Sequence, residues 1–504
     1  MTNKVFSCTL TGLACQTVEV QADISNGMPT FNIVGLGDAS IKESKERVRS
    51  SIKNSKAHFP QTRKTINLAP AQIKKQGSLF DLPIAASILL ASQQIPPHNL
   101  QNSIIVGELS LTGQIKPVKG ILPITQHAKS SGFTKIFLPK ENALEASFID
   151  NIQIYPLESL KQFIDFALNK IKLTPTPPQK ILHSQRIPVH SPFSHIIGNE
   201  KAKRALTVSA AGGHSVLLSG SPGCGKTLLC RAYKNLLPQM NKEEILQTTK
   251  IYSISGLTST TQPLILSRPF REIHHTATKA SITGGGPSPH PGEISLAHNG
   301  VLFLDEISEF DKSTLETLRQ PLEDKFINIT KAAYSQKFPA NFILLATTNP
   351  CPCGYYKDSA KKCKCRPHEV KNYQKRLSGP LLDRFDIFVD VEKSKMEKIF
   401  HPPAHVSRSL LNSITLANKI QNERFLPLTD IHKNADMTHS EITKHCILSP
   451  QNQSCLTQAA KSYNLSNRAY LKILKLARTI ADLDLSTQIQ TQHLLEAMQY
   501  RAKN

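Results

Sequence analysis

The chain has 504 residues, of which 61 are lysine or arginine and 38 are aspartate or glutamate, and its formal net charge is +23. This length exceeds what one hydrophobic core organises and predicts about three or four compact units; the charge favours a large acidic partner such as nucleic acid, with solvated surface lysines as the alternative. Ten cysteines in so long a chain exclude a disulfide-stapled secreted domain, and since no apolar run reaches ~20 residues and none opens the sequence, we expect a cytoplasmic protein without membrane contact.

Residues 1–170 mix strand-like runs, such as 103–106, with helical ones, such as 82–91, which predicts an α+β domain. Between residues 42 and 75 this segment carries ten lysines and arginines against two glutamates. Such a density suits contact with a phosphate backbone, and one solvated face of an amphipathic helix explains it equally well. Residues 171–193 contain five prolines and little apolar pattern, which predicts a linker.

Residues 194–394 alternate apolar strands with helical stretches. Three strands, SVLLSG, VLFLDE and NFILLATTNP, are apolar almost throughout, as the central strands of parallel sheets are. We therefore expect a doubly wound α/β domain. Residues 395–504 show apolar residues at helical spacing, as in RAYLKILKLARTIADL, and predict a small all-helical domain.

A phosphate-binding loop follows the first of these strands. It matches the pattern G-x-x-x-x-G-K-[ST], with the apolar strand before it and the helix-forming stretch after it that the pattern requires. In such a loop backbone N–H groups turn toward the phosphates, the lysine binds the β and γ oxygens, and the hydroxyl ligates Mg²⁺. We expect ATP and Mg²⁺ to be bound by Gly220, Ser221, Pro222, Gly223, Cys224, Gly225, Lys226 and Thr227.

Two carboxylates, Asp305 and Glu306, end the second strand. Such a pair could be a solvated turn. Beside a phosphate loop, however, one carboxylate is needed for the water shell of the metal and the other to accept a proton from the attacking water. We assign Asp305 to magnesium and Glu306 to the base. Asn349 ends the third strand and is suited to orient that water, although Asn-Pro alone indicates an ordinary turn.

Two arginines are candidates for contact with the γ-phosphate. Arg384 lies between Asp383 and Asp386, where a local ion pair would contribute little; directed at a neighbouring subunit's phosphate, its guanidinium would be an arginine finger. Arg468 is expected in the first turn of a helix capped by Ser466, where the helix dipole disfavours a cation. That position predicts an anion nearby.

Four cysteines crowd into the stretch CPCGYYKDSAKKCKC as C-x-C, nine residues and C-x-C. Four thiolates in a short polar loop can hold a structural Zn²⁺, although paired ligands are more often spaced C-x-x-C, and four reduced cytosolic thiols are an equal alternative. His274 and His275 have no cysteine or carboxylate at ligand spacing and are expected to be structural. The candidate zinc ligands are Cys351, Cys353, Cys363 and Cys365.

Over nearly its whole length the chain resembles the magnesium-chelatase-like AAA+ ATPases, in particular the YifB/ComM family. The motifs that carry the resemblance are RPFREIHHT (268–276), GGGPSPHPGEISLAHNGVLFLDE (284–306), LEDKFINI (322–329), SGPLLDRFD (378–386) and LSNRAYLKILKLARTIADL (465–483). The resemblance implies a Walker A loop at 220–227, a Walker B end at Asp305–Glu306, sensor 1 at Asn349, a trans-acting finger at Arg384 and the sensor 2 arginine of a helical lid at Arg468. A finger acting in trans implies a closed ring of identical subunits, which is typically hexameric in this family.

The first 170 residues resemble the α/β domain of Lon-type proteases, on the motifs KKQGSLFDLPIAASILLA (74–91) and GELSLTGQIKPVKGILPITQHAKSSGFTKIFLPKEN (107–142). A Lon-type protease needs a serine that a lysine activates. The register places Leu79 and Leu122 at these positions, and only a slipped register would use Ser78 with Lys116 or Lys119. The resemblance implies a non-catalytic binding or ring-stabilising module.

Three uses of ATP remain open. ComM-like proteins are understood as helicases that promote branch migration in natural transformation, so the resemblance implies sequence-independent binding of single-stranded or branched DNA. The hairpin predicted from KFINITKAAYSQKF (325–338) would then present Lys325, Lys331 or Lys337 to DNA in the pore. The alternatives are the motor of a magnesium chelatase, whose dedicated subunits lack the Lon-like domain, and ATP-dependent proteolysis, which the missing dyad disfavours.

Overall fold

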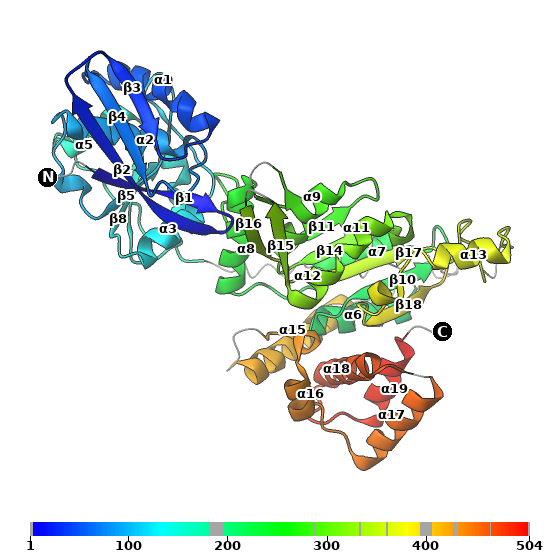
Figure 1. The fold of residues 1–504 in the computed structure, drawn as a ribbon. Helices are drawn as coiled ribbons and strands as arrows, with labels where there is room; N and C mark the ends of the chain where they lie inside the picture. Colours follow the sequence, from blue (N-terminus) through cyan, green and yellow to red (C-terminus); the bar gives the residue numbers. More distant parts are fainter. Residues whose placement is uncertain are drawn as a thin grey trace.

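The computed structural model describes residues 4–181, 193, 196, 198–286, 289–331, 334–358, 361–393, 406–426, 431–463 and 465–501. These residues form an amino-terminal region up to residue 181, a central region from 198 to 393 and a helical region from 406 to 501. Figure 1 shows the amino-terminal region at one end of the molecule and the helical region against one side of the central region. Residues 182–192 of the predicted linker and the predicted boundary between 394 and 395 lie outside the described residues.

The amino-terminal region is built on a seven-stranded sheet in the order β3-β4-β2-β1-β5-β8-β9. Antiparallel pairs join β2 to β1 and β4, and the other neighbours are parallel. α2 is buried along almost its whole length, as a helix that is apolar all round is. The elements are β1 (Lys4–Thr11), β2 (Ala14–Ser25), β3 (Thr30–Val34), α1 (Ala39–Asn54), β4 (Arg63–Ala69), α2 (Asp81–Ala91), β5 (Ser103–Ile105), β6 (Glu108–Leu109), β7 (Ile115–Lys116), α3 (Ile121–Ser130), β8 (Lys135–Pro139), α4 (Ala143–Ala146), β9 (Gln153–Leu157) and α5 (Leu160–Ala167).

The central region contains a five-stranded parallel sheet in the order β11-β14-β17-β10-β18. Its elements are α6 (Glu200–Gly212), β10 (Val216–Gly220), α7 (Lys226–Tyr233), α8 (Lys242–Ser255), β11 (Phe270–Ile273), α9 (Lys279–Thr283), β12 (Gly284–Gly285), β13 (His290–Pro291), α10 (Glu293–Leu296), β14 (Val301–Leu304), α11 (Lys312–Glu316), α12 (Arg319–Asp324), β15 (Phe326–Lys331), β16 (Tyr334–Pro339), β17 (Ile343–Thr348), α13 (Pro367–Gln374), α14 (Gly379–Leu382) and β18 (Ile387–Val391).

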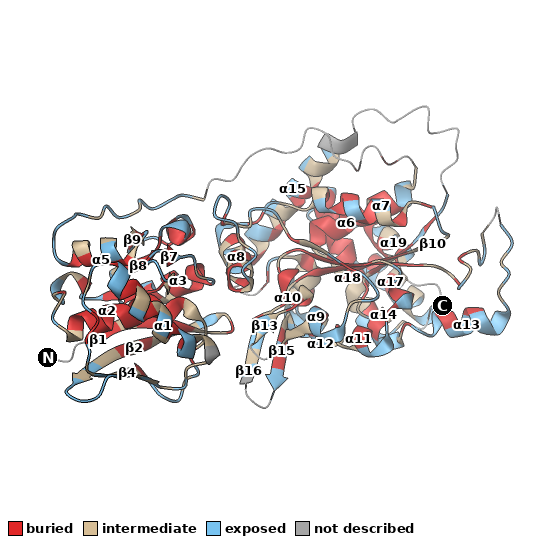
Figure 2. Cartoon of the chain, turned by 90° about the horizontal axis from the view of Figure 1, so that it is seen from above, coloured by how far each residue is buried: buried red, intermediate tan, exposed pale blue. Residues whose placement is uncertain are grey.

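Both faces of this sheet are buried. Along β10, Val216 and Leu218 belong to the hydrophobic cluster on one face and Leu217 to the cluster on the other, and β14 and β17 alternate in the same way. Figure 2 shows the sheet as a buried layer between helices. The nearly continuous apolar runs of the sequence follow from this double cover, and the predicted parallel α/β core is confirmed.

The helical region consists of α15 (Val406–Phe425), α16 (His439–His445), α17 (Pro450–Ser462), α18 (Asn467–Leu483) and α19 (Thr491–Gln499). Ser466 caps α18 as predicted, since its hydroxyl accepts a 3.2 Å bond from the N–H of Ala469. The buried face of α18 joins the same hydrophobic cluster as α6 and one face of the central sheet. None of the described helices is long and apolar enough to cross a membrane.

A buried polar contact joins the amino-terminal region to the central one. Glu145, at the end of α4, accepts hydrogen bonds from the Ser253 hydroxyl at 2.5 Å and from the Leu122 N–H at 3.1 Å. The Ser253 carbonyl in turn accepts a bond from the N–H of Gly120 at 3.1 Å. Burial raises the pKa of Glu145, and these donors only partly oppose it. The contact ties α3 and α4 to α8 and gives the two regions a defined orientation.

An ion cluster joins the helical region to the central one. Asp386, just before β18, accepts a bond from Lys472 of α18 at 2.7 Å and lies 3.5 Å from His214 Nδ1. The Asp386 Oδ2 that faces His214 also accepts a bond from the Ser215 N–H at 3.2 Å, while Lys472 binds Oδ1. Burial alone would raise the pKa of Asp386, but Lys472 and His214 outweigh it and hold that pKa well below its usual range.

We expect Asp386→Asn to lower the free energy of unfolding by about 3 kcal/mol, because it leaves Lys472, whose side chain is 13% exposed, without its counter-charge. The wild-type contribution is present above the unfolded pKa of about 3.9 and is lost as the pH falls below it, since the folded pKa is depressed. Urea unfolding followed by circular dichroism at several pH values measures both effects. Asp390→Asn, at an exposed aspartate of β18, is the control, and equal losses in the two variants would contradict the assignment.

Candidate active site

The carboxyl ends of three neighbouring strands meet at one edge of the central sheet. β10 ends at Gly220, β14 at Leu304 and β17 at Thr348, and β17 lies between the other two. The residues that follow these ends are the phosphate loop, the Asp305–Glu306 pair and Asn349. The parallel sheet therefore brings the predicted nucleotide-site residues together from three segments far apart in the sequence.

Glycines shape the loop between β10 and α7. Gly223 and Gly225 have φ angles of 77° and 94°, in the left-handed region that glycine adopts without strain. A Cβ built on either would meet nothing within 4 Å, whereas one on Gly220 would lie 2.4 Å from the carbonyl oxygen of Val391. Gly220 thus lets β10 approach β18, and the other two leave open space beside the amino terminus of α7, where an anion is favoured.

Lys226 begins α7 and is buried at this edge, with 8% of its surface exposed. Its Nζ donates to the carbonyl oxygens of Gly220 and Ser221 at 2.6 and 3.1 Å and to Asn349 Oδ1 at 3.1 Å. Burial lowers its pKa, and the nearby thiols and carboxylates only partly oppose this. A phosphate oxygen would supply the negative charge that these three neutral acceptors lack.

Thr227 and Asp305 fit a magnesium ion. Thr227 Oγ1 donates to Asp305 Oδ2 at 3.0 Å, and Asp305 Oδ1 accepts a 2.5 Å bond from Thr347 Oγ1. A hydroxyl and a carboxylate this close offer the hard oxygen ligands that Mg²⁺ takes, with water and phosphate for the other positions. Sequence reasoning misses Thr347; its only signal is that it is one of two hydroxyl residues at the end of an apolar strand, where it is fully buried.

Glu306 follows Asp305 in a left-handed backbone conformation, with φ 52°. For a residue other than glycine this conformation is costly and persists only where the surroundings enforce it. The Glu306 N–H donates to Thr347 Oγ1 at 2.9 Å, which holds the turn. The exposed Glu306 carboxylate accepts a long, 3.5 Å bond from Asn349 Nδ2. The two side chains predicted to handle the attacking water are therefore neighbours.

Arg384 lies at the opposite edge of the same sheet, where the parallel strands begin. The N–H groups of Asp386 and Ile387, which follow it, donate to the carbonyl of Ser215, where β10 begins. β10 and β18 run parallel over five residue pairs, so the phosphate loop lies about 16 Å away at the far end of the strands. Arg384 is placed away from the phosphate loop of its own chain.

Glu323 of α12 binds both predicted arginines. Its Oε1 accepts bonds from Arg384 Nη2 at 2.6 Å and Arg468 Nη2 at 2.8 Å, so Arg468 shares the position of Arg384. Burial would raise the pKa of Glu323, but the two arginines outweigh it and lower that pKa. The anion predicted near Arg468 is thus a carboxylate of its own chain. The local ion pair considered for Arg384 is with Glu323, while the neighbouring Asp386 pairs with Lys472.

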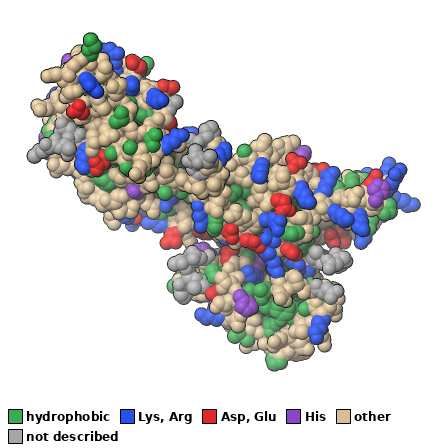
Figure 3. Space-filling model, in the orientation of Figure 1, with side chains coloured by type: hydrophobic (Ala, Val, Ile, Leu, Met, Phe, Trp, Pro, Cys, Tyr) green, Lys and Arg blue, Asp and Glu red, His purple; other side chains and the backbone are tan. Residues whose placement is uncertain are grey.

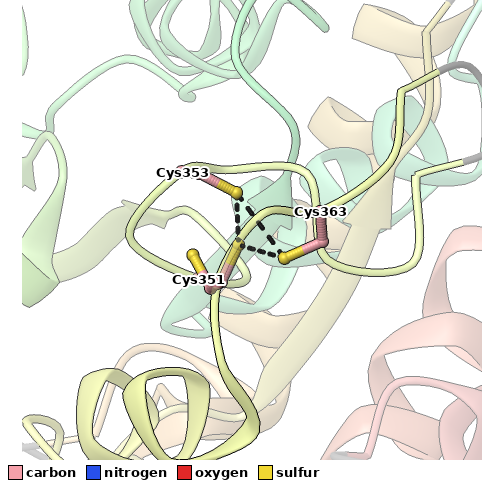
Figure 4. A group of neighbouring side chains, drawn as sticks. Cys351, Cys353 and Cys363 are labelled. Atoms are coloured by element: carbon pink, nitrogen blue, oxygen red, sulfur yellow. Dashed lines mark hydrogen bonds between the residues drawn. The ribbon is translucent and has the colours of Figure 1, made fainter.

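The four cysteines converge. Figure 4 shows Cys351, Cys353 and Cys363 turned toward one another, with sulfur separations of 3.4, 3.6 and 3.7 Å, and Cys365 completes a set within 4.8 Å. A tetrahedral Zn²⁺ with bonds of about 2.3 Å requires sulfur separations of about 3.8 Å, so the set fits zinc. The N–H groups of Tyr355 and Lys364 lower the pKa of Cys353 to about 6, which favours its thiolate, whereas burial and the neighbouring thiols raise the pKa values of Cys363 and Cys365.

The loop that carries these cysteines packs against the phosphate loop. A Cβ on Gly354 would lie 2.5 Å from Pro222 Cδ, so the two backbones approach closely. Asp358 accepts a hydrogen bond from the Ser221 hydroxyl and lies 3.5 Å from Lys393. Sequence reasoning misses Asp358 because no motif marks it. The candidate zinc site therefore braces the candidate nucleotide site.

The hairpin predicted from residues 325–338 is present as β15 and β16. Figure 2 shows it projecting from the central region with an exposed end. Lys331 is exposed at the end of β15, where its Nζ donates to the carbonyl of Gly286 at 3.0 Å, and Lys337 Nζ lies over the Phe326 ring at 3.5 Å from its centroid. Lys325 lies instead at the base, 3.2 Å from Asp436 of the helical region. Only Lys331 and Lys337 are therefore placed to meet a ligand along the hairpin.

Leu79 and Leu122, which the resemblance matches to the dyad of Lon-type proteases, are buried apolar side chains. The adjacent Ser78 donates its hydroxyl hydrogen to Glu108 Oε2. A carboxylate acceptor of this kind does not replace the lysine of that dyad. His274 and His275 are exposed, with ring centroids 4.1 Å apart and planes tilted by 35°, and the described residues place no third metal-ligating side chain beside them.

The lysines and arginines in residues 42–75 differ in how far they are buried. Lys64 and Lys75 are buried and donate to backbone carbonyls, and Arg47 binds the buried carboxylate of Asp81 at 2.6 Å. These three are occupied within the fold. The cations left exposed to a partner are Lys42, Arg49, Lys53, Lys56, Arg63 and Lys74, and Lys45 is partly buried.

Comparisons with known proteins cover the whole of this architecture. The family described as "Magnesium chelatase, subunit ChlI" matches residues 192–399, "Subunit ChlI of Mg-chelatase" matches 20–142 and "Magnesium chelatase, subunit ChlI C-terminal" matches 404–501. YifB of Salmonella typhimurium is 38% identical over 97% of this chain and 95% of its own. The competence protein ComM of Haemophilus influenzae is 38% identical over 99% and 97%. The magnesium-chelatase 67 kDa subunit of Heliobacterium mobile is 24% identical over 45% and 39%.

We expect the purified chain to contain about one zinc ion per subunit. Replacing Cys353 and Cys363 together by serine should abolish this content and also weaken binding of a fluorescent ATP analogue, because the phosphate loop loses its brace. Elemental analysis after dialysis and a fluorescence titration measure the two effects. Cys455→Ser, outside the cluster, is the control. A wild-type chain free of zinc after purification without chelator would contradict the assignment.

Proposed function

Since the chain belongs to the YifB/ComM family of magnesium-chelatase-like AAA+ ATPases, we propose that it is a ring-forming motor that couples ATP hydrolysis to movement along DNA. The observation that carries the proposal is the separation of two sets of residues on one sheet. The phosphate loop and the carboxylates lie at one edge, and both arginines lie at the other.

In this proposal the first edge binds and cleaves the nucleotide. Lys226 exchanges its neutral acceptors for the β and γ oxygens of ATP, and Thr227 and Asp305 hold Mg²⁺, which neutralises charge on those oxygens. Glu306 accepts a proton from the attacking water. Asn349, which contacts both Lys226 and Glu306, orients that water against the γ-phosphate.

The arginines at the second edge act at the nucleotide of a neighbouring subunit. Arg384 and Arg468 are separated from their own phosphate loop by the length of the sheet, so they can stabilise the charge of the transition state only at another chain's nucleotide. Each site then needs two subunits, and a closed ring gives every subunit both neighbours. We propose the hexamer that is typical of this family.

We propose that DNA is the polymer along which the ring moves. The exposed lysines of the β15–β16 hairpin and the exposed cations between residues 42 and 75 offer phosphate contacts without base-specific donors, which fits sequence-independent binding. One relative of nearly full length is named a competence protein. We propose a helicase that promotes branch migration of single-stranded or branched intermediates in natural transformation.

We propose that residues 1–170 form a Lon-like module that binds or stabilises the ring, followed by a linker at 171–193, an ATPase core at 194–394 and a lid at 395–504. The buried Leu79 and Leu122 disfavour proteolysis. The motor of a magnesium chelatase is the second candidate. It is disfavoured because the relative named as a magnesium-chelatase 67 kDa subunit aligns with 45% of the chain, whereas YifB and ComM align with almost all of it.

We expect ATP turnover to rise with single-stranded, duplex or branched DNA at low salt, and the stimulation to fall steeply as salt is added, because phosphate contacts release counterions. Glu306→Gln should bind nucleotide and assemble while turnover falls by about 100-fold or more. Steady-state phosphate release across a salt series measures this. If none of the three DNAs changed the rate of ATP turnover at low salt, the proposal that the ring moves along DNA would be overturned.

Arg384→Ala should lower turnover by about 100-fold or more, since it removes the finger from every site. Mixing it with Glu306→Gln should restore turnover, because the second variant lends its intact arginine to the intact carboxylate of the first. Random mixing of equal amounts completes about a quarter of the interfaces. Phosphate release from premixed subunits measures the recovery. No recovery, although mixed rings form by native mass spectrometry, would show that the arginine does not act between chains.

A further inference from the structure

The carboxylate of Glu323 is shared by the two arginines assigned to the neighbouring subunit. Both ion pairs use the same oxygen, so the two guanidinium nitrogens can be no farther apart than the sum of the 2.6 and 2.8 Å contacts. Two cations this close repel each other unless an anion lies between them. Glu323 therefore determines where both arginines lie when no phosphate is near them.

The side chain of Arg384 is largely buried against its own chain. Its side chain is only 11% exposed, its Nη1 donates to the carbonyl of Pro380 at 2.9 Å, and its Nε is buried without a hydrogen-bond partner among the described residues. Glu323 is its ion-pair partner in the described structure. To stabilise a phosphate of another chain, Arg384 has to leave this position, and the contact with Glu323 has to break or move with it.

Glu323 also lies at the base of the hairpin. It is the penultimate residue of α12, Lys325 follows in a left-handed conformation with φ 60°, and β15 begins at Phe326. Lys325 pairs with Asp436 of the helical region at 3.2 Å. Figure 3 shows acidic and basic side chains gathered where the central and helical regions meet. Glu323 therefore lies three residues before the first strand of the hairpin.

We propose that Glu323 is a positioning residue that holds Arg384 and Arg468 back until the nucleotide of the adjoining subunit draws them off, and so links that nucleotide to the β15–β16 hairpin of its own chain. The inference rests on the proposed ring function and adds a regulating contact to it. A γ-phosphate competes with the carboxylate for the same guanidinium groups, since both are bidentate oxygen acceptors. Once released, Glu323 no longer ties the base of the hairpin to the arginines.

The test is Glu323→Gln, which keeps the shape of the side chain and removes its charge. We expect turnover without DNA to rise about threefold or more, because the arginines are no longer restrained, and the ratio of DNA-stimulated to DNA-free turnover to fall toward one. Asp324→Asn is the matched control, because the adjacent carboxylate is exposed and has no ion-pair partner in the described part of the chain, and it should behave like the wild type.

Glu323→Asp keeps the charge on a shorter side chain and should give an intermediate ratio, which distinguishes restraint from a folding defect; thermal unfolding of each variant accompanies the assay. Equal behaviour of Glu323→Gln and Asp324→Asn would overturn the inference. A fall of DNA-free turnover in Glu323→Gln to the level of Arg384→Ala would also overturn it, because Glu323 would then support the arginines instead of restraining them. If the subunit-mixing experiment restores turnover in either case, the proposed ring stands and only the role of Glu323 fails.

Discussion

The parallel alignment of β14, β17 and β10, buried on both faces, is the constraint on which the other features of this protein depend. It forces the ends of three strands to one edge, so that Lys226, Asp305 and Asn349 meet although they come from distant segments. The same alignment sends the strand beginnings, and with them Arg384, to the opposite edge. A sheet with one strand reversed would place neither set of residues correctly.

In the proposed ring, the two edges are the two halves of one site. The edge with the phosphate loop holds Lys226 and the carboxylates, and the other edge holds Arg384 and Arg468 on one carboxylate. Assembly into the proposed ring would join the halves, and in the single chain Glu323 binds both arginines. A pair of neighbouring cations would otherwise be electrostatically costly.

Contacts around the phosphate loop are supplied by segments that do no chemistry themselves. The cysteine loop touches Pro222 and Ser221 through Gly354 and Asp358, and Thr347 holds both Asp305 and the turn at Glu306. These groups keep the loop and the carboxylates in place before a nucleotide binds, which lowers the cost of ordering them on binding. The left-handed Glu306 is the clearest sign of such support, because that conformation does not persist alone.

The sequence by itself determined what is local: the apolar strands, the glycines and lysine of the phosphate loop, the carboxylate pair, the cap at Ser466 and the four-cysteine stretch. Each of these follows from spacing or composition within a few residues. Only the tertiary structure decided which distant groups meet, such as Thr347 with Asp305, Asp358 with Ser221 and Glu323 with both arginines. In the structure Lys325 lies at the base of the hairpin and not along it as predicted, and Lys64 and Lys75 are buried. The physical reason is that a pairing between remote side chains depends on how the elements pack, and short-range patterning carries no record of that packing.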